Sequence, residues 1–201
     1  MSRLRIILWS LVAAIALIAG ALWIVGDRLV APQGGVRTSG VANIGGPFTL
    51  TTHDGKTLSS AELAGRPFAV FFGFTHCPDV CPTTLFEMSE NLKALGPDGD
   101  KLTVLFISVD PERDTRELMA TYLQSFDPRI IGLTGTQEEI DAVVKAYRAT
   151  YQRVPTEGGD YTVNHTASVY LMDRQGHFAG TLDYHEQQDT QMRKLRRLVE
   201  G

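Results

Sequence analysis

Two strand-length runs of this chain are almost entirely apolar, and they restrict its fold more than any other feature of the sequence. The first extends from Phe68 to Phe74, directly after Pro67, and the second from Leu102 to Val109. Neither run alternates polar with apolar residues, so neither has the pattern of a strand with one face in water. We therefore expect two strands that are buried on both faces, in a sheet covered by helices.

Strand and helix patterns alternate around these two runs. S-x-x-E and T-x-x-E sequences, typical of capping boxes, precede two of the expected helices, and Asp114 and Asp189 are expected to cap two more. The expected strands are 48–52, 68–74, 102–109, 130–133, 168–172 and 177–182, the last two joined by a turn at 173–176, and the expected helices are a short one from 59–62, then 82–95, 114–124, 136–151 and 189–200. This order predicts an α/β domain with a mixed central sheet.

The first part of the chain contains an uncharged, mostly apolar run of 21 residues from Ile6 to Gly26. At about 1.5 Å per residue, such a helix would cross a hydrocarbon core of about 30 Å. Arg3 and Arg5 precede it, which favours a cytoplasmic N-terminus and places everything after Asp27 on the other side of the membrane. A cleaved signal peptide is the alternative, and it would export the domain as well.

Three regions are therefore predicted. Residues 1–28 form a cytoplasmic N-terminus and a transmembrane anchor, residues 29–45 a flexible linker, and residues 46–201 one domain.

The net charge is −4 for the chain, and the +2 of residues 1–28 leaves −6 for the remainder. A protein that binds nucleic acid would need a basic face to neutralise phosphates, so we expect no nucleic-acid partner.

The chain has only two cysteines, Cys77 and Cys81, and they follow the first buried strand at the start of a predicted helix. The free N–H groups of a helix N-terminus favour the thiolate, the form of cysteine that attacks disulfides and binds metals. Three interpretations remain open from these residues alone. They are a structural disulfide, a redox-active pair, and a site for a soft metal such as copper(I) completed by an imidazole.

Three segments resemble motifs of the Sco/SenC family of thioredoxin-like copper proteins, which help to assemble the CuA centre of cytochrome c oxidase. They are G-F-T-H-C-P-D-V-C-P at 73–82, S-V-D-P-E-R-D-T at 108–115 and D-Y-T-V-N-H-T at 160–166. The resemblance extends over about residues 45–198. It implies a thioredoxin-like fold and a metal site made of Cys77, Cys81 and His165 that binds one copper as Cu(I) or Cu(II). It also implies that the two cysteines can form a disulfide.

The same resemblance implies a function, and the predicted anchor implies a location. The protein would be a copper metallochaperone and not an enzyme, and it would act on the oxidase subunit that carries the CuA centre. An upstream copper donor or a thiol reductant would be a further partner. The predicted anchor would hold the domain on the periplasmic face of the cytoplasmic membrane. The alternatives are a thiol-disulfide reductase that uses Cys77 and Cys81 to keep the CuA cysteines reduced, and a copper or redox sensor.

Four further residues are predicted to support the metal site. His76, Pro78 and Asp79 adjoin or separate the two cysteines, and Asn164 precedes His165. Family members usually have Asp before this histidine, so Asn164 removes a negative charge that could tune the metal or contact a partner. The three acidic residues Asp110, Glu112 and Asp114 could suggest a carboxylate pair for catalysis. A strand-to-helix turn with its cap also explains them, and we adopt that interpretation.

Overall fold

The computed structural model describes residues 5, 9 and 43–201, and residues 43–201 belong to one compact unit. Apart from residue 9, the predicted membrane-spanning run 6–26 lies outside the described residues, as does the predicted linker up to residue 42. None of the helices within the described residues has both the length and the apolar character that a membrane crossing requires.

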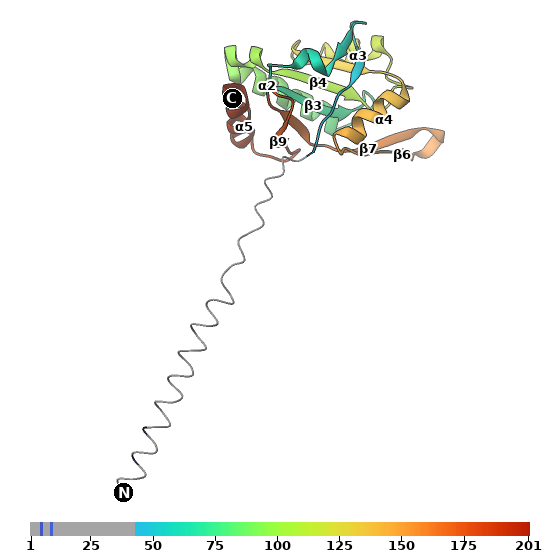
Figure 1. Cartoon of the computed structure of the whole chain (residues 1–201). Coiled ribbons are helices and arrows are strands. Elements are labelled where there is room, and N and C mark those ends of the chain that lie inside the picture. Colours follow the sequence, from blue (N-terminus) through green and yellow to red (C-terminus); the bar gives the residue numbers. More distant parts are fainter. Residues whose placement is uncertain (1–4, 6–8, 10–42) are drawn as a thin grey trace. The chain divides into compact units, whose positions relative to one another are not determined.

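The described part of the chain alternates strands and helices (Figure 1). Its strands are β1 (Thr49–Thr52), β2 (Thr57–Ser59), β3 (Phe68–Gly73), β4 (Thr103–Ser108), β5 (Ile130–Thr134), β6 (Tyr151–Pro155), β7 (Tyr161–His165), β8 (Val169–Met172) and β9 (Phe178–Leu182). Its α-helices are α2 (Val80–Leu95), α3 (Arg116–Leu123), α4 (Gln137–Ala146) and α5 (Gln188–Glu200), and its short 3-10 helices are η1 (Ser60–Leu63), η2 (Gly96–Lys101) and η3 (Glu157–Gly159).

Seven strands form one mixed sheet in the order β2-β1-β5-β4-β3-β8-β9. The pairs β3–β4 and β4–β5 are parallel, and every other pair in this sheet is antiparallel. The remaining strands, β6 and β7, form a separate antiparallel hairpin. The predicted α/β domain with a mixed sheet is therefore confirmed.

The two apolar runs form the centre of the sheet. Every residue of β3 is buried, and in β4 every residue after Thr103 is buried. Strands β3 and β4 pair in parallel from Phe68↔Thr103 to Gly73↔Ser108, so their carboxyl ends lie together at one edge of the sheet. Because both faces of these strands pack against apolar side chains, the expectation of doubly buried strands is confirmed.

Two predicted capping boxes are present. Ser59 accepts a hydrogen bond from the backbone while Glu62 accepts one from the backbone N–H of Ser59, and Thr136 and Glu139 do the same at the start of α4. The first box begins only the 3-10 helix η1, whereas the second begins an α-helix. In both places the sequence located the start of the helix correctly.

The predicted caps at Asp114 and Asp189 are wrong. The cap of α3 is Thr115, whose Oγ1 accepts a hydrogen bond from the N–H of Leu118, and the cap position of α5 is Gln187. The Asp114 carboxylate cannot cap the helix because it is buried and bonded to other segments of the chain.

The predicted helix 136–151 is too long, since α4 ends at Ala146. Arg148 has φ = 55°, a left-handed backbone conformation that a right-handed helix cannot contain. Tyr151 then pairs with His165 at the open end of the β6–β7 hairpin. The hairpin lies beside α4, because the Tyr151 hydroxyl accepts a hydrogen bond of 2.7 Å from the side chain of Gln137 (Figure 1).

Candidate metal centre

Cys77 and Cys81 lie where β3 ends and α2 begins. Cys81 is buried in the first turn of α2, whereas Cys77 is half-buried in the preceding loop. Gly73 allows this close approach, because a Cβ at that position would lie 2.8 Å from the Cys81 sulfur and 2.6 Å from a ring carbon of Phe106. A larger residue would force the helix away from the strand. The two thiols are free.

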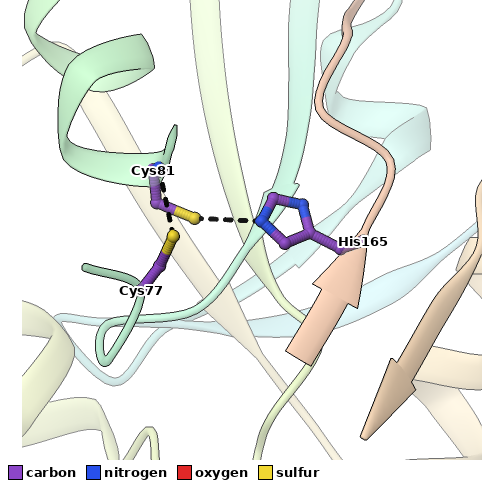
Figure 2. A group of neighbouring side chains, drawn as sticks. All are labelled: Cys77, Cys81 and His165. Atoms are coloured by element: carbon purple, nitrogen blue, oxygen red, sulfur yellow. Dashed lines mark hydrogen bonds between the residues drawn. The ribbon is translucent and has the colours of Figure 1, made fainter. Parts of the chain in front are cut away.

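His165, at the end of β7, lies next to both cysteines although it is 84 residues from Cys81. Its Nε2 is 3.3 Å from the Cys81 Sγ, and the Nε2 atom and the two sulfurs all lie within 4.8 Å of one another. Figure 2 shows the three side chains pointing toward one another, from the loop, from the first turn of α2 and from the end of β7. The structure thus brings together the three predicted ligand residues.

The imidazole of His165 is held in one orientation. Its Nδ1 lies 3.0 Å from the carbonyl oxygen of Thr166, and since a carbonyl only accepts, Nδ1 carries the hydrogen. This bond fixes the ring so that its other nitrogen, Nε2, faces the two sulfurs, the orientation that a metal-binding histidine requires. The rings of Phe71 and Phe74 each contact the imidazole edge-on, with ring centroids 5.9 Å away.

The pKa values of the two thiols are shifted in opposite directions. Hydrogen bonds lower the pKa of Cys77 to about 4, the largest contribution coming from the Cys81 thiol and smaller ones from His165 and the backbone N–H groups of Asp79 and Cys81. The N–H of Cys81 lies 3.3 Å from the Cys77 sulfur. Burial raises the pKa of Cys81, and the neighbouring Cys77 raises it further. Cys77 is therefore the thiolate at neutral pH, and Cys81 is the protonated thiol.

These donors fit a soft metal ion. Two sulfurs and one imidazole nitrogen are ligands that copper(I) prefers, whereas a closed structural zinc site normally has four protein ligands. Within residues 5, 9 and 43–201, no second group of three His, Cys, Asp or Glu side chains has its ligand atoms this close together.

His76 and Asp79, two of the predicted supporting residues, lie beside the metal centre but outside the ligand group. His76 has its Nδ1 3.1 Å from the Thr75 Oγ1 and 3.6 Å from the Asp114 carboxylate. Asp79 is exposed just before α2, where it lies 3.4 Å from the Tyr184 hydroxyl. Both residues therefore belong to the loop that carries Cys77, and their side chains contact other residues than the two cysteines and His165.

Pro78 and Asn164 are exposed. Pro78 is in the cysteine loop, and Asn164 occupies β7 immediately before His165. Because successive side chains of a strand point to opposite faces, Asn164 points away from the side of the hairpin on which the imidazole lies.

The role of Asp114 was not expected from the sequence. This buried carboxylate accepts hydrogen bonds from the Thr75 N–H (2.9 Å), the Thr75 hydroxyl (2.6 Å) and the Ser108 hydroxyl (2.7 Å). It therefore ties the cysteine loop to the end of β4. The sequence contains a signal for this role, since Thr75 and Asp114 belong to the motifs 73–82 and 108–115, but the second motif taken alone predicts only a turn and a helix cap.

A family model described as SCO1/SenC matches residues 36–200. Among curated relatives, the mitochondrial SCO1 homolog of Mus musculus is 47% identical over 151 residues, which are 74% of this chain and 52% of that protein. The chain thus spans about half the length of the curated relatives it matches first.

Solved structures share the fold. ScoI of Bradyrhizobium japonicum with copper bound is 51% identical, with a TM-score of 0.72 over 77% of this chain and 99% of that one. BsSco, described as a member of the Sco family of cytochrome c oxidase assembly proteins with a disulfide switch, is 26% identical, with a TM-score of 0.63 over 79% of this chain and 95% of that one. These matches confirm the thioredoxin-like fold.

Proposed function

Because this chain belongs to the SCO1/SenC family, we propose that it is a copper chaperone that holds one copper ion between Cys77, Cys81 and His165. The observation that supports this most strongly is the convergence of two sulfurs and an imidazole nitrogen within 4.8 Å. The similarity to a copper-bound ScoI supports copper as the metal. Copper is the cargo of this protein, so the site must both bind it and release it.

The residues of the site are suited to taking up copper and passing it to a partner. Cys77 offers a thiolate at neutral pH without losing a proton first, and the bond from Nδ1 to Thr166 holds Nε2 of His165 toward the sulfurs as the third ligand atom. Cys81 must lose its proton when the metal binds, which couples binding to pH. Since Cys77 is half-buried and Cys81 fully buried, a partner's sulfur reaches the copper from the Cys77 side without opening the core.

The recipient in this proposal is the CuA centre of cytochrome c oxidase. The family resemblance of the three motifs supports this partner, and an upstream donor supplies the copper. The apolar run 6–26 with Arg3 and Arg5 before it supports a single-pass anchor in the cytoplasmic membrane and a domain in the periplasm. Alkaline phosphatase fused after residue 201 is active only outside the cytoplasm, and an inactive fusion would contradict this topology.

A deletion strain tests the delivery. Under low copper, its oxidase should contain less copper than the wild-type oxidase, and the intact gene should restore the content. His165→Ala and Cys77→Ser should both fail to restore it. Normal oxidase copper in the deletion strain would remove the proposed role.

The acidity of Cys77 favours a second candidate, a thiol-disulfide reductase for the cysteines of the oxidase subunit. The Cys77 thiolate would attack one sulfur of the substrate disulfide and displace the other as a thiolate. Cys81 would then lose its proton and attack the Cys77 sulfur, which releases the second substrate thiolate and leaves a Cys77–Cys81 disulfide. Two electrons pass to the substrate. If His165→Ala restores the deletion strain while Cys77→Ser does not, the reductase is the correct function.

A further inference from the structure

The hairpin that carries His165 is separate from the central sheet. Strands β6 and β7 pair only with each other, from Tyr151↔His165 to Pro155↔Tyr161. An isolated two-stranded hairpin is marginally stable in water. The position of the imidazole relative to the cysteines must therefore depend on side chains that tie the hairpin to the rest of the domain.

Tyr161, the first residue of β7, makes several of these ties. Two guanidinium groups lie over its ring, that of Arg113 at 3.7 Å and that of Arg153 at 4.7 Å from the ring centroid, and its hydroxyl donates a hydrogen bond of 2.8 Å to Asp110. Asp110 is completely buried, and it also accepts from Arg113 at 2.5 Å and from Arg153 at 3.3 Å. We call these four residues the Asp110 cluster.

Within the Asp110 cluster, Arg113 lies in the turn between β4 and α3, and it bonds both to this turn and to the hairpin segment. Its Nε donates to Asp110 in the turn between β4 and α3, while its Nη1 donates to the Asp160 carboxylate at 3.1 Å and to the Tyr161 carbonyl at 2.9 Å. Its side chain is only 18% exposed. A planar guanidinium can make these bonds at once because its N–H groups diverge in one fork.

The same turn also holds the cysteine loop. The N–H of Asp110 donates to the Ser108 hydroxyl at 3.0 Å, and that hydroxyl donates to Asp114, which binds Thr75 two residues before Cys77. Both halves of the metal centre are therefore fixed to the turn 108–114.

From this arrangement we propose that Arg113 and Tyr161 are positioning residues of the metal centre, which hold the β6–β7 hairpin so that the His165 imidazole faces the two cysteines. The identity of the metal in this proposal rests on the proposed copper function, but the positioning of the His165 imidazole does not require copper. Neither residue touches the ligand sulfurs, and both act through His165.

Arg129 offers a matched control. It is also a partly buried arginine that binds a buried aspartate, with bonds of 2.8 and 2.7 Å to Asp127 and a side chain 29% exposed. It lies before β5 and has no hydrogen bond to the hairpin among the described residues. Arg129→Gln should therefore lower stability as Arg113→Gln does while leaving His165 in place.

The first experiment measures the Cu(I) affinity of the purified full chain by competition with a colorimetric chelator. Arg113→Gln should weaken binding about tenfold or more, as loss of residues that orient a ligand commonly does, and Arg129→Gln should not change it. In a His165→Ala background, Arg113→Gln should cause no further loss, because its effect passes through the imidazole. An equal loss in both backgrounds would overturn the proposal, as would equal losses for Arg113→Gln and Arg129→Gln.

The second experiment needs no metal. In the copper-free full chain in detergent, NMR contacts between the ring protons of His165 and Phe74 should be present in the wild type and in Arg129→Gln but lost in Arg113→Gln. If Arg113→Gln does not fold, Tyr161→Phe removes only the hydroxyl bond to Asp110 and should weaken the same contacts. Unchanged contacts in a folded variant refute the positioning role, whereas a wild type that keeps them but binds no copper refutes only the proposed function.

Discussion

Replacing Cys81 with alanine should raise the pKa of the Cys77 thiol. The hydrogen bond from the Cys81 thiol makes the largest contribution to the lowered pKa of Cys77, which is about 4 instead of the ordinary 9.0. The N–H of residue 81 remains in the variant, so part of the lowering should persist. His165→Ala should also raise this pKa, but less, because the bond to His165 contributes less than the one to Cys81.

The size of the effect can be worked out for alkylation at pH 5. About 90% of Cys77 is then ionised, against roughly one in 10,000 molecules of an unperturbed thiol with a pKa of 9.0. A thiolate whose pKa is lower by about five units is also roughly 100 to 300 times less nucleophilic. The two factors together leave Cys77 about 30 to 100 times more reactive than an unperturbed thiol at this pH.

The assay is the rate of alkylation by iodoacetamide as a function of pH, with peptide mass spectrometry to separate the two cysteines. In the reduced wild-type chain, modification of Cys77 should have its midpoint near pH 4, because a lowered pKa keeps the thiolate present at every higher pH. Cys81 should stay unmodified up to pH 9, since burial raises its pKa and blocks access. A midpoint for Cys77 near pH 9, or faster modification of Cys81, would refute this account of the site.

Three further predictions concern stability, measured by urea unfolding. Gly73→Ala should cost about 1–3 kcal/mol, because its Cβ would overlap a buried ring and a buried sulfur; an unchanged midpoint would contradict this. Asp114→Ala should cost about 3 kcal/mol, since it leaves Thr75 without its acceptor; a cost near zero would show the contact to be dispensable. The hydrogen bonds from Arg129 lower the pKa of Asp127, so their interaction stabilises the fold above the ordinary pKa of Asp. This stabilisation is lost as the pH falls through the lowered pKa. The stability gap between wild type and Arg129→Gln should therefore close in acid, and a gap independent of pH would exclude this linkage.

The centre of the sheet and the three candidate ligand residues were predicted from the sequence for different reasons. Strands β3 and β4 follow from composition, because a strand as apolar as Phe68 to Phe74 is stable only when both of its faces are buried. The position of His165 does not follow from composition. It was predicted from the resemblance of the segment 160–166, since no local pattern places an imidazole beside a residue 84 positions earlier.

The errors lie where distant contacts decide the local structure. The helix pattern after Thr136 continues past Ala146, but Tyr151 pairs with His165 and so belongs to a hairpin. Asp114 has the spacing of a helix cap, yet its carboxylate binds Thr75, and the adjacent Thr115 caps α3 in its place. Neither outcome can be derived from neighbouring residues, because the competing partner is a strand or loop elsewhere in the chain.

X-ray absorption at the copper edge of the Cu(I)-loaded full chain tests the central claim most directly. The account predicts one copper per chain, with two sulfur ligands and one imidazole nitrogen in the wild type. His165→Ala should lose the imidazole contribution, and Cys77→Ser and Cys81→Ser should each lose one sulfur. Copper whose spectrum is the same in the wild type and in His165→Ala would contradict the claim that these three side chains hold the metal.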